Sequence, residues 1–152
     1  MNETIYAIIP SISGEDMKKL IEIRMHNLEE EHSEVLYCGV QELSKKGNKM
    51  KVSYDDKQGV HTEISFFEKG MRIVRSGSVE SDLRFLLGHR SSGTMETPYG
   101  TLRLDIMTKK YLVSEHTIAM EYELYSAQEN CGAFRFIMKI REVAAWMKLN
   151  SI

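Results

Sequence analysis

The sequence predicts an all-β protein whose strands close into an antiparallel up-and-down barrel. Three observations predict it: apolar and polar residues alternate along most of the chain after residue 48, short turns separate the alternating runs, and helical patterns are few. One-sided strands in a small domain must bury their apolar faces together. A sheet closed on itself does so and also removes its exposed edges.

The alternation is clearest in four segments. Side chains on a strand point to opposite faces in turn, so each segment offers one face to a core and one to water. A helix built from these segments would scatter its apolar residues around its circumference. The apolar members are Met50, Val52 and Tyr54; Leu102, Leu104 and Ile106; Ile118, Met120, Tyr122 and Leu124; and Phe134, Phe136, Met138 and Ile140.

Turn-forming residues lie between these runs. Glycine supplies positive φ there, and Pro98 prevents a ladder from continuing. Such short connections favour neighbouring antiparallel strands. The predicted turns are Gly47-Asn48, Gln58-Gly59, Lys69-Gly70, Ser76-Gly77, Ser92-Gly93, Pro98-Tyr99-Gly100 and Cys131-Gly132.

The N-terminal third fits two patterns equally well. Over residues 13–28 a helical template follows a capping-box-like start and places on one face Met17, Leu20, Ile21, Met25 and Leu28. A strand also fits residues 21–25, where apolar and polar residues alternate. The acidic run at 29–31 predicts an exposed turn before a second strand at about 35–43. Residues 142–149 favour a short helix or tail.

Length and composition indicate one globular domain. With 152 residues, 42% hydrophobic and 28% charged, the chain can bury a core without disulfides. A net charge of −2 argues against nucleic-acid binding, which requires a basic face. The lysines between residues 45 and 51 are interpreted as a solvated hairpin tip.

The sequence also predicts the cellular compartment of the protein. No signal peptide and no run of about 20 apolar residues is visible, so we expect a cytoplasmic protein that does not contact membranes. Cys38 and Cys131 could pair in a secreted protein. In the cytosol we expect them to be reduced and packed as small hydrophobes.

A set of residues in a characteristic order spans about four-fifths of the chain. It comprises Gly39, Val52-Ser53-Tyr54, Arg75-Ser76-Gly77, Phe85, Gly88, Thr97-Pro98-Tyr99-Gly100, Leu102, Leu104, Thr108 and Tyr122. From about Lys19 to Arg141 the sequence therefore resembles the uncharacterised bacterial YwiB-like family, whose members look like calycins, the superfamily of lipocalin-type barrels.

The resemblance implies a closed antiparallel barrel of about eight or more strands and a strand over residues 20–25. It implies no catalytic residues, because the family has no established activity. The lipocalin pairing of a first-strand tryptophan with a late arginine is absent, since the only tryptophan is Trp146. We divide the chain into an N-terminal extension (1–16), a calycin-like barrel domain (17–142) and a C-terminal tail (143–152).

Sequence motifs for catalysis or metal binding are absent. No histidine has a second histidine or a cysteine at the short spacing of compact zinc sites, and no nucleophile elbow or phosphate-binding loop occurs. Asp55-Asp56 lies at a predicted hairpin end, where solvation disfavours general acid chemistry. We therefore expect no metal and no cofactor, and we favour a protein without enzymatic activity over the alternatives of a metal site or a hydrolase site assembled across strands.

The inward register is rich in methionine and aromatic residues, which adapt to an apolar guest but can equally fill the barrel. Its aromatic members are Tyr54, Phe66, Phe85, Tyr122, Phe134 and Phe136. Arg75 and Tyr99 could point at a ligand's polar end near the barrel mouth. Alternatively, Arg75 pairs with a carboxylate on a neighbouring strand and Tyr99 packs over the barrel end. We predict a non-enzymatic barrel that binds a small, mostly apolar ligand in its interior, with Tyr54, Arg75, Phe85, Tyr99, Tyr122 and Phe136 as the binding residues.

A second hypothesis is a protein-interaction or self-association module, such as a homodimer, with a filled barrel and no ligand. Its basis is the apolar residues Leu86, Ala119 and Ile137 on the outward register, together with an apolar arm at residues 5–9 outside the common domain. Apolar residues on an outer face require cover.

Overall fold

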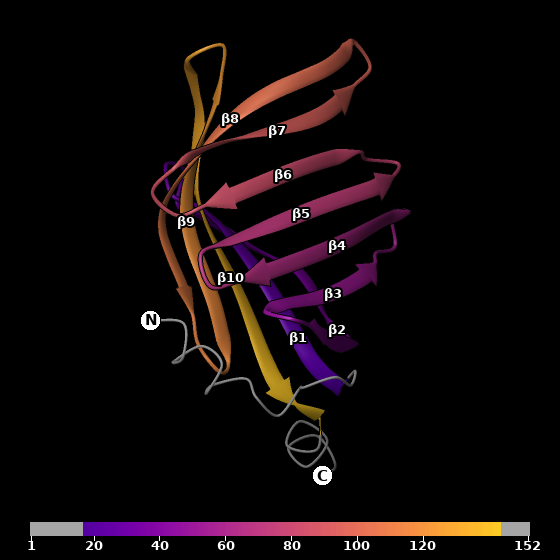
Figure 1. Cartoon of the computed structure of the whole chain (residues 1–152). Helices are drawn as coiled ribbons and strands as arrows, with labels where there is room; N and C mark the ends of the chain where they lie inside the picture. The colour runs from indigo at the N-terminus through magenta and orange to yellow at the C-terminus, as the bar shows by residue number, and fades with distance from the viewer. Residues whose placement is uncertain (1–16, 144–152) are drawn as a thin grey trace.

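The computed structural model describes residues 17–143 and folds them into ten strands. The strands are β1 (Met17–Asn27), β2 (His32–Lys46), β3 (Lys49–Asp55), β4 (Val60–Phe67), β5 (Gly70–Gly77), β6 (Ser81–Leu86), β7 (Arg90–Thr97), β8 (Gly100–Val113), β9 (Thr117–Ser126) and β10 (Glu129–Glu142). Each is antiparallel to the next along the chain, and β1 also pairs with β10, which closes the barrel (Figure 1). The predicted up-and-down barrel is confirmed.

The strand interpretation of the N-terminal third is correct, and the helical template is wrong. β1 pairs with β10 on one side and with β2 on the other, and the side chains of Ile21 and Ile23 are fully buried. Cross-strand pairing on both edges outweighs a local capping signal. The acidic turn is confirmed, with Glu31 in the left-handed region. Most of the predicted C-terminal helix or tail lies outside the described residues.

Two of the predicted turns are wrong. Ser92-Gly93 lies inside β7, where a Cβ on Gly93 would stand 2.7 Å from Leu83 Cδ2 and 3.1 Å from Ile106 Cδ1. This glycine therefore permits close packing between neighbouring strands rather than a turn. Cys131-Gly132 lies inside β10 at a register shift, and the chain reverses earlier, at Ala127 and Gln128, both with positive φ.

The inward-facing side chains fill the barrel. The predicted inward register is confirmed for Tyr54, Phe66, Phe85, Tyr122 and Phe136, and Phe134 is half-buried. Tyr122 lies between two other rings, with its centroid 4.7 Å from that of Phe85 and 5.6 Å from that of Phe134. Each fully buried aromatic side chain contributes about 1.5–3 kcal/mol of hydrophobic free energy.

The two ends of the barrel differ. At the end carrying the β4–β5 turn, the Tyr111 hydroxyl lies 2.9 Å from the carbonyl oxygen of Phe67 and 2.7 Å from that of Gly70, and so ties β8 across to that turn. Lys19 and Glu142 form an ion pair at the same end. The opposite end carries the β3–β4 and β5–β6 turns and is called the barrel mouth below (Figure 1).

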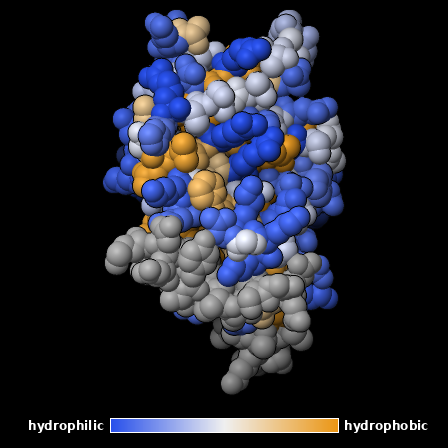
Figure 2. Space-filling view, viewed as in Figure 1, coloured by the Kyte–Doolittle hydropathy of each residue, from blue (hydrophilic) through white to orange (hydrophobic). Residues whose placement is uncertain are grey.

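The outer surface is largely hydrophilic over β4, β5 and β6, and hydrophobic side chains gather at its left margin, near the end of β6 (Figure 2). Leu86 and Leu87, at that end of β6, are both exposed. Among residues 17–143, the structure has no helix long and apolar enough to cross a membrane.

Candidate functional site

The barrel wall is incomplete between β2 and β3. These strands pair at only three positions next to their connecting turn, from Ser44–Lys51 to Lys46–Lys49. Further along, β2 stays paired with β1, but its register shifts between Ile23 and Arg24, where Leu36 is the extra residue. Such a bulge bends a strand and increases its twist. The remaining length of β2 therefore diverges from β3 and leaves a seam in the wall.

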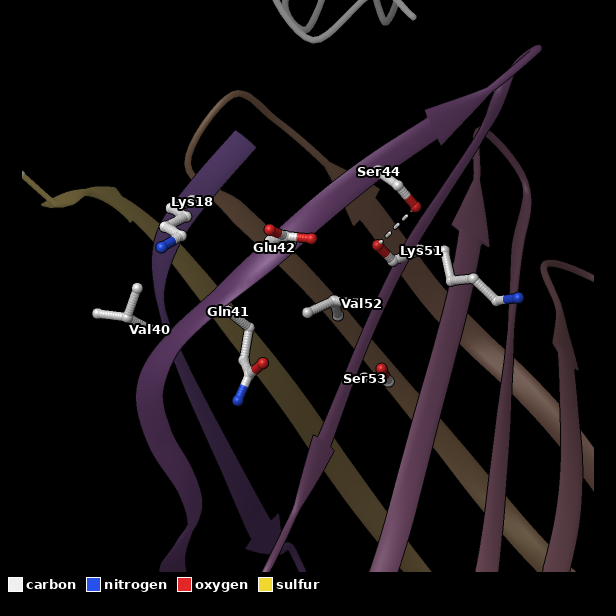
Figure 3. A pocket seen from close by; sticks show the side chains of 8 residues that line it. All are labelled: Lys18, Val40, Gln41, Glu42, Ser44, Lys51, Val52 and Ser53. Carbon is white, nitrogen blue, oxygen red and sulfur yellow. Dashed lines mark hydrogen bonds between the residues drawn. The ribbon is translucent and has the colours of Figure 1, made fainter. Parts of the chain in front are cut away.

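A hollow of about 450 Å³ lies in this seam on the outer side of the barrel. Figure 3 shows side chains of β2, among them Gln41 and Glu42, on one side of the hollow and those of β3, including Val52 and Ser53, on the other side. The Ser44 hydroxyl donates to the Lys51 carbonyl oxygen where β2 and β3 begin to pair. We call this space the seam hollow.

Two stacked tyrosines close the seam from inside. The rings of Tyr37 on β2 and Tyr54 on β3 lie 4.1 Å apart at an interplanar angle of 19°. The Gln41 amide donates to the Tyr37 hydroxyl over 2.7 Å. The ring passes over Gly39, where an added Cβ would stand 2.3 Å from the Tyr37 hydroxyl oxygen. Only glycine leaves room for this ring position.

A second hollow, of about 420 Å³, lies at the barrel mouth. We call it the mouth hollow. Tyr54, Thr62 and Arg75 enter it from three adjacent strands, because Tyr54 pairs with Thr62 and Thr62 pairs with Arg75 in the sheet register. The remaining lining residues are Glu34, Val35, Leu36, Asp56, Lys57, Gln58, Val60 and Val79.

Arg75 is the central cation of the mouth hollow. It is half-buried, and within residues 17–143 its guanidinium makes no hydrogen bond or ion pair. The predicted alternative, in which Arg75 pairs with a carboxylate on a neighbouring strand, is therefore wrong. Arg72 on the outer face of β5 makes such a pair instead, with two bonds of 2.9 and 2.6 Å to Asp82.

The phenols near Arg75 are held neutral. Burial raises the pKa of Tyr54, and the Thr62 hydroxyl and the positive charge of Arg75 oppose that shift. Burial also raises the pKa of Tyr122, again against Arg75. The Tyr122 hydroxyl lies 3.6 Å from Met25 Sδ, a weak acceptor. The mouth hollow therefore places the guanidinium of Arg75 beside the uncharged hydroxyl groups of Tyr54 and Thr62.

The arrangement can be compared with known proteins. A family model described as a domain of unknown function, DUF1934, matches residues 19–138. The chain belongs to the DUF1934 family. Its fold is similar to the crystal structure of ywiB protein from Bacillus subtilis, with a TM-score of 0.60 and 18% identity over 82% of this chain and 92% of that one. No curated protein sequence matches the chain.

In this DUF1934 barrel the predicted site residues separate into three groups. Tyr54 and Arg75 line the mouth hollow. Phe85, Tyr122 and Phe136 are buried in the interior. Tyr99 is 99% exposed at the tip of the β7–β8 hairpin, so its predicted packing over the barrel end is wrong.

Sequence reasoning missed Thr62 and Leu36 at the mouth and Tyr37 in the seam. Thr62 is an inward position of β4 that period-two alternation could have identified. Leu36 is the extra residue of the bulge in β2 and Tyr37 follows it, and alternation fails there because the register shifts. No local signal marks such a shift.

Among residues 17–143 no three histidine, cysteine or acidic side chains lie together as a metal site would require. Cys38 and Cys131 are free and exposed, so their predicted packing as small hydrophobes is wrong. Asp55 is exposed at its hairpin end, and its Oδ1 lies 2.8 Å from His61 Nδ1.

Proposed function

We propose that this protein is a calycin-like, non-enzymatic carrier that binds a small, mostly apolar molecule at the barrel mouth. The observation that carries the proposal is the mouth hollow. At about 420 Å³ it is within the size range of small-molecule sites, and three convergent polar side chains, Tyr54, Thr62 and Arg75, meet an apolar wall there.

The filled interior restricts where the guest can lie. The rings of Phe85, Tyr122 and Phe134 pack together inside the barrel, so we place the ligand at the mouth, against Val35, Leu36 and Val60, rather than in the interior that the sequence predicts. Phe85 and Phe136 then support the floor of the site without contacting the guest. We place this binding in the cytoplasm, where the two exposed cysteines would remain reduced.

The proposal is tested with N-phenyl-1-naphthylamine, a neutral dye that fluoresces in apolar surroundings. We expect saturable fluorescence with one dye per chain, and weaker binding after Leu36→Trp fills the hollow. Leu86→Trp, exposed on the outer face at the other end of the barrel, is the matched control and should leave binding unchanged. Absence of saturable fluorescence, together with native mass spectra of host-purified protein free of any bound small molecule, would refute the proposal.

A second candidate function is self-association through the outer face of β8, β9 and β10. Leu112 is 62% exposed and pairs in register with Ala119, which pairs with Ile137, so an apolar stripe crosses three strands. Glu121 accepts from Arg135 beside the stripe. A two-fold axis through the stripe would bury it against itself. Sedimentation velocity should then show a dimer that Leu112→Asp dissociates. A monomer at all concentrations would exclude this function.

A further inference from the structure

We propose that the ligand of the mouth hollow is an organic monoanion, whose carboxylate or sulfonate head is bound by Arg75 while its apolar body lies on the wall formed by β2 and β4. This inference rests on the proposed function and adds the chemical class of the ligand. Its basis is that the half-buried guanidinium of Arg75 makes no hydrogen bond or ion pair within residues 17–143.

The guanidinium of Arg75 lacks the partner that its position requires. A guanidinium has five donors in a fixed fork and cannot lose its charge. Removing a charge from water is costly unless it is paired. Arg75 is half-buried and makes no hydrogen bond or ion pair within residues 17–143, whereas Arg72, more exposed on the same strand, has a two-bond carboxylate partner. An anionic guest would supply the missing acceptor.

The acidic residues of the hollow do not supply it. Asp56 Oδ1 accepts from the backbone N–H of Gln58 at 2.8 Å and of Val60 at 3.2 Å, so this carboxylate closes its own turn. Neither Asp56 nor Glu34 lies within ion-pair distance of Arg75, although both line the hollow. Lys57, exposed on the same rim, adds a second positive charge to the lining.

The groups around Arg75 are donors suited to an oxyanion. Thr62 is its direct cross-strand neighbour, and Tyr54 is the neighbour of Thr62. Hydrogen bonds from a guanidinium to a carboxylate are charge-assisted and about twice as strong as neutral ones.

The wall beside Arg75 defines the rest of the ligand. Val35, Leu36 and Val60 supply apolar surface, and the hollow holds a body of roughly two fused rings or a short alkyl chain. A polyanion fits less well, because Glu34 and Asp56 lie on the same rim. One negative charge next to a compact apolar body is the chemistry that the hollow favours.

The experiment compares two dyes that share one ring system. 8-Anilinonaphthalene-1-sulfonate is the sulfonated analogue of the neutral N-phenyl-1-naphthylamine. We expect the sulfonate to bind the wild-type chain about tenfold more tightly. Arg75→Met should abolish this preference while the neutral dye still binds, and Arg75→Lys should keep part of it. Arg72→Met, on the outer face of the same strand, is the matched control and should keep all of it.

A competition with wild-type protein keeps the test independent of variant folding. 1-Naphthoate should displace the bound sulfonate dye, and 1-naphthamide, its uncharged counterpart, should do so about tenfold less well. If the neutral dye binds but the charged one has no advantage, the inference fails and the proposed function stands. Preference that persists in Arg75→Met also overturns the inference. If neither dye binds and native mass spectra of host-purified protein show no bound small molecule, both the proposed function and the inference are refuted.

Discussion

Tyr37 stacks on Tyr54 across the part of the barrel wall where β2 and β3 no longer pair. Side-chain contact there replaces the hydrogen-bonded ladder that joins the strands elsewhere. Gln41, whose amide donates to the Tyr37 hydroxyl, lines the seam hollow, and Tyr54 lines the mouth hollow. The stability of the wall and the shape of the candidate site therefore depend on the same pair of rings.

Removal of the Tyr37 ring should destabilise this part of the wall more than removal of its hydroxyl. Tyr37→Ala loses the stack and half-buried apolar surface, with an expected decrease of about 2 kcal/mol in the free energy of unfolding. Tyr37→Phe loses only the bond from Gln41, with an expected decrease of about 1 kcal/mol. Urea unfolding measures both. Equal losses would show that the stack contributes nothing.

The effect of a methyl group at Gly39 should change sign with the residue at position 37. In the wild type, Gly39→Ala places a Cβ 2.3 Å from the Tyr37 hydroxyl oxygen, and we expect a loss of about 1–3 kcal/mol. In a Tyr37→Ala background the clash is gone. The same change should then stabilise the protein by about 0.5 kcal/mol, because alanine lowers the conformational entropy of the unfolded chain. A double-mutant cycle measures the coupling. Additive effects would contradict the position of the Tyr37 ring over Gly39.

Gly93 should be intolerant of alanine although it is not in a turn. An added Cβ would meet Leu83 Cδ2, Ile106 Cδ1 and, at 3.1 Å, the carbonyl oxygen of Asp82. Because the last of these is backbone, relief requires β6 to move, and we expect a loss of about 1–3 kcal/mol in unfolding free energy. The exposed neighbour Ser92→Ala is the control and should change stability by less than about 0.5 kcal/mol.

Thr108→Val should stabilise the protein. The Thr108 hydroxyl is buried without a hydrogen-bond partner in the described part of the chain, and valine has nearly the same shape. Replacement removes the cost of desolvating an unpaired polar group, so the free energy of unfolding should rise by about 1 kcal/mol. Thr101→Val, which instead loses an exposed bond to Glu96, should give no gain. A decrease for Thr108→Val would indicate a bound partner at this hydroxyl.

Stability should fall in alkaline solution because of the buried Tyr122. Burial raises the pKa of its phenol above the unfolded value of about 10, so the proton is held more tightly in the folded state. Below pH about 10 the stabilisation from the protonated Tyr122 phenol is fully present. Above that pH the phenol ionises in the unfolded chain before it ionises in the folded one, and the free energy of unfolding falls by up to about 1.4 kcal/mol per pH unit.

Tyr122→Phe should lessen this alkaline loss in urea titrations from pH 8 to 11. Tyr99→Phe serves as the matched control, because the Tyr99 side chain is exposed and folding changes little around it. A curve for Tyr122→Phe that coincides with the wild type would contradict the burial of this phenol.

Local alternation in the sequence was enough to determine the strands and the face of each that points inward. Period two is a property of the extended chain itself, so residues such as Tyr54, Phe66 and Tyr122 could be assigned to the interior from their neighbours alone. The same patterning predicted closure, because one-sided strands in a single small domain need a shared core. Glycine was ambiguous: at Gly47 it marks a turn, and at Gly93 it marks close packing between strands.

Only the tertiary structure decided where the wall opens and which side chains meet there. The seam arises from a register shift between β1 and β2, and the mouth hollow from cross-strand pairs that join Tyr54, Thr62 and Arg75. Register depends on hydrogen bonds between residues far apart in the chain, which local composition does not encode. For that reason the sequence identified Arg75 as a candidate but could not show that it has no carboxylate partner within residues 17–143, or that Tyr99 is exposed to solvent.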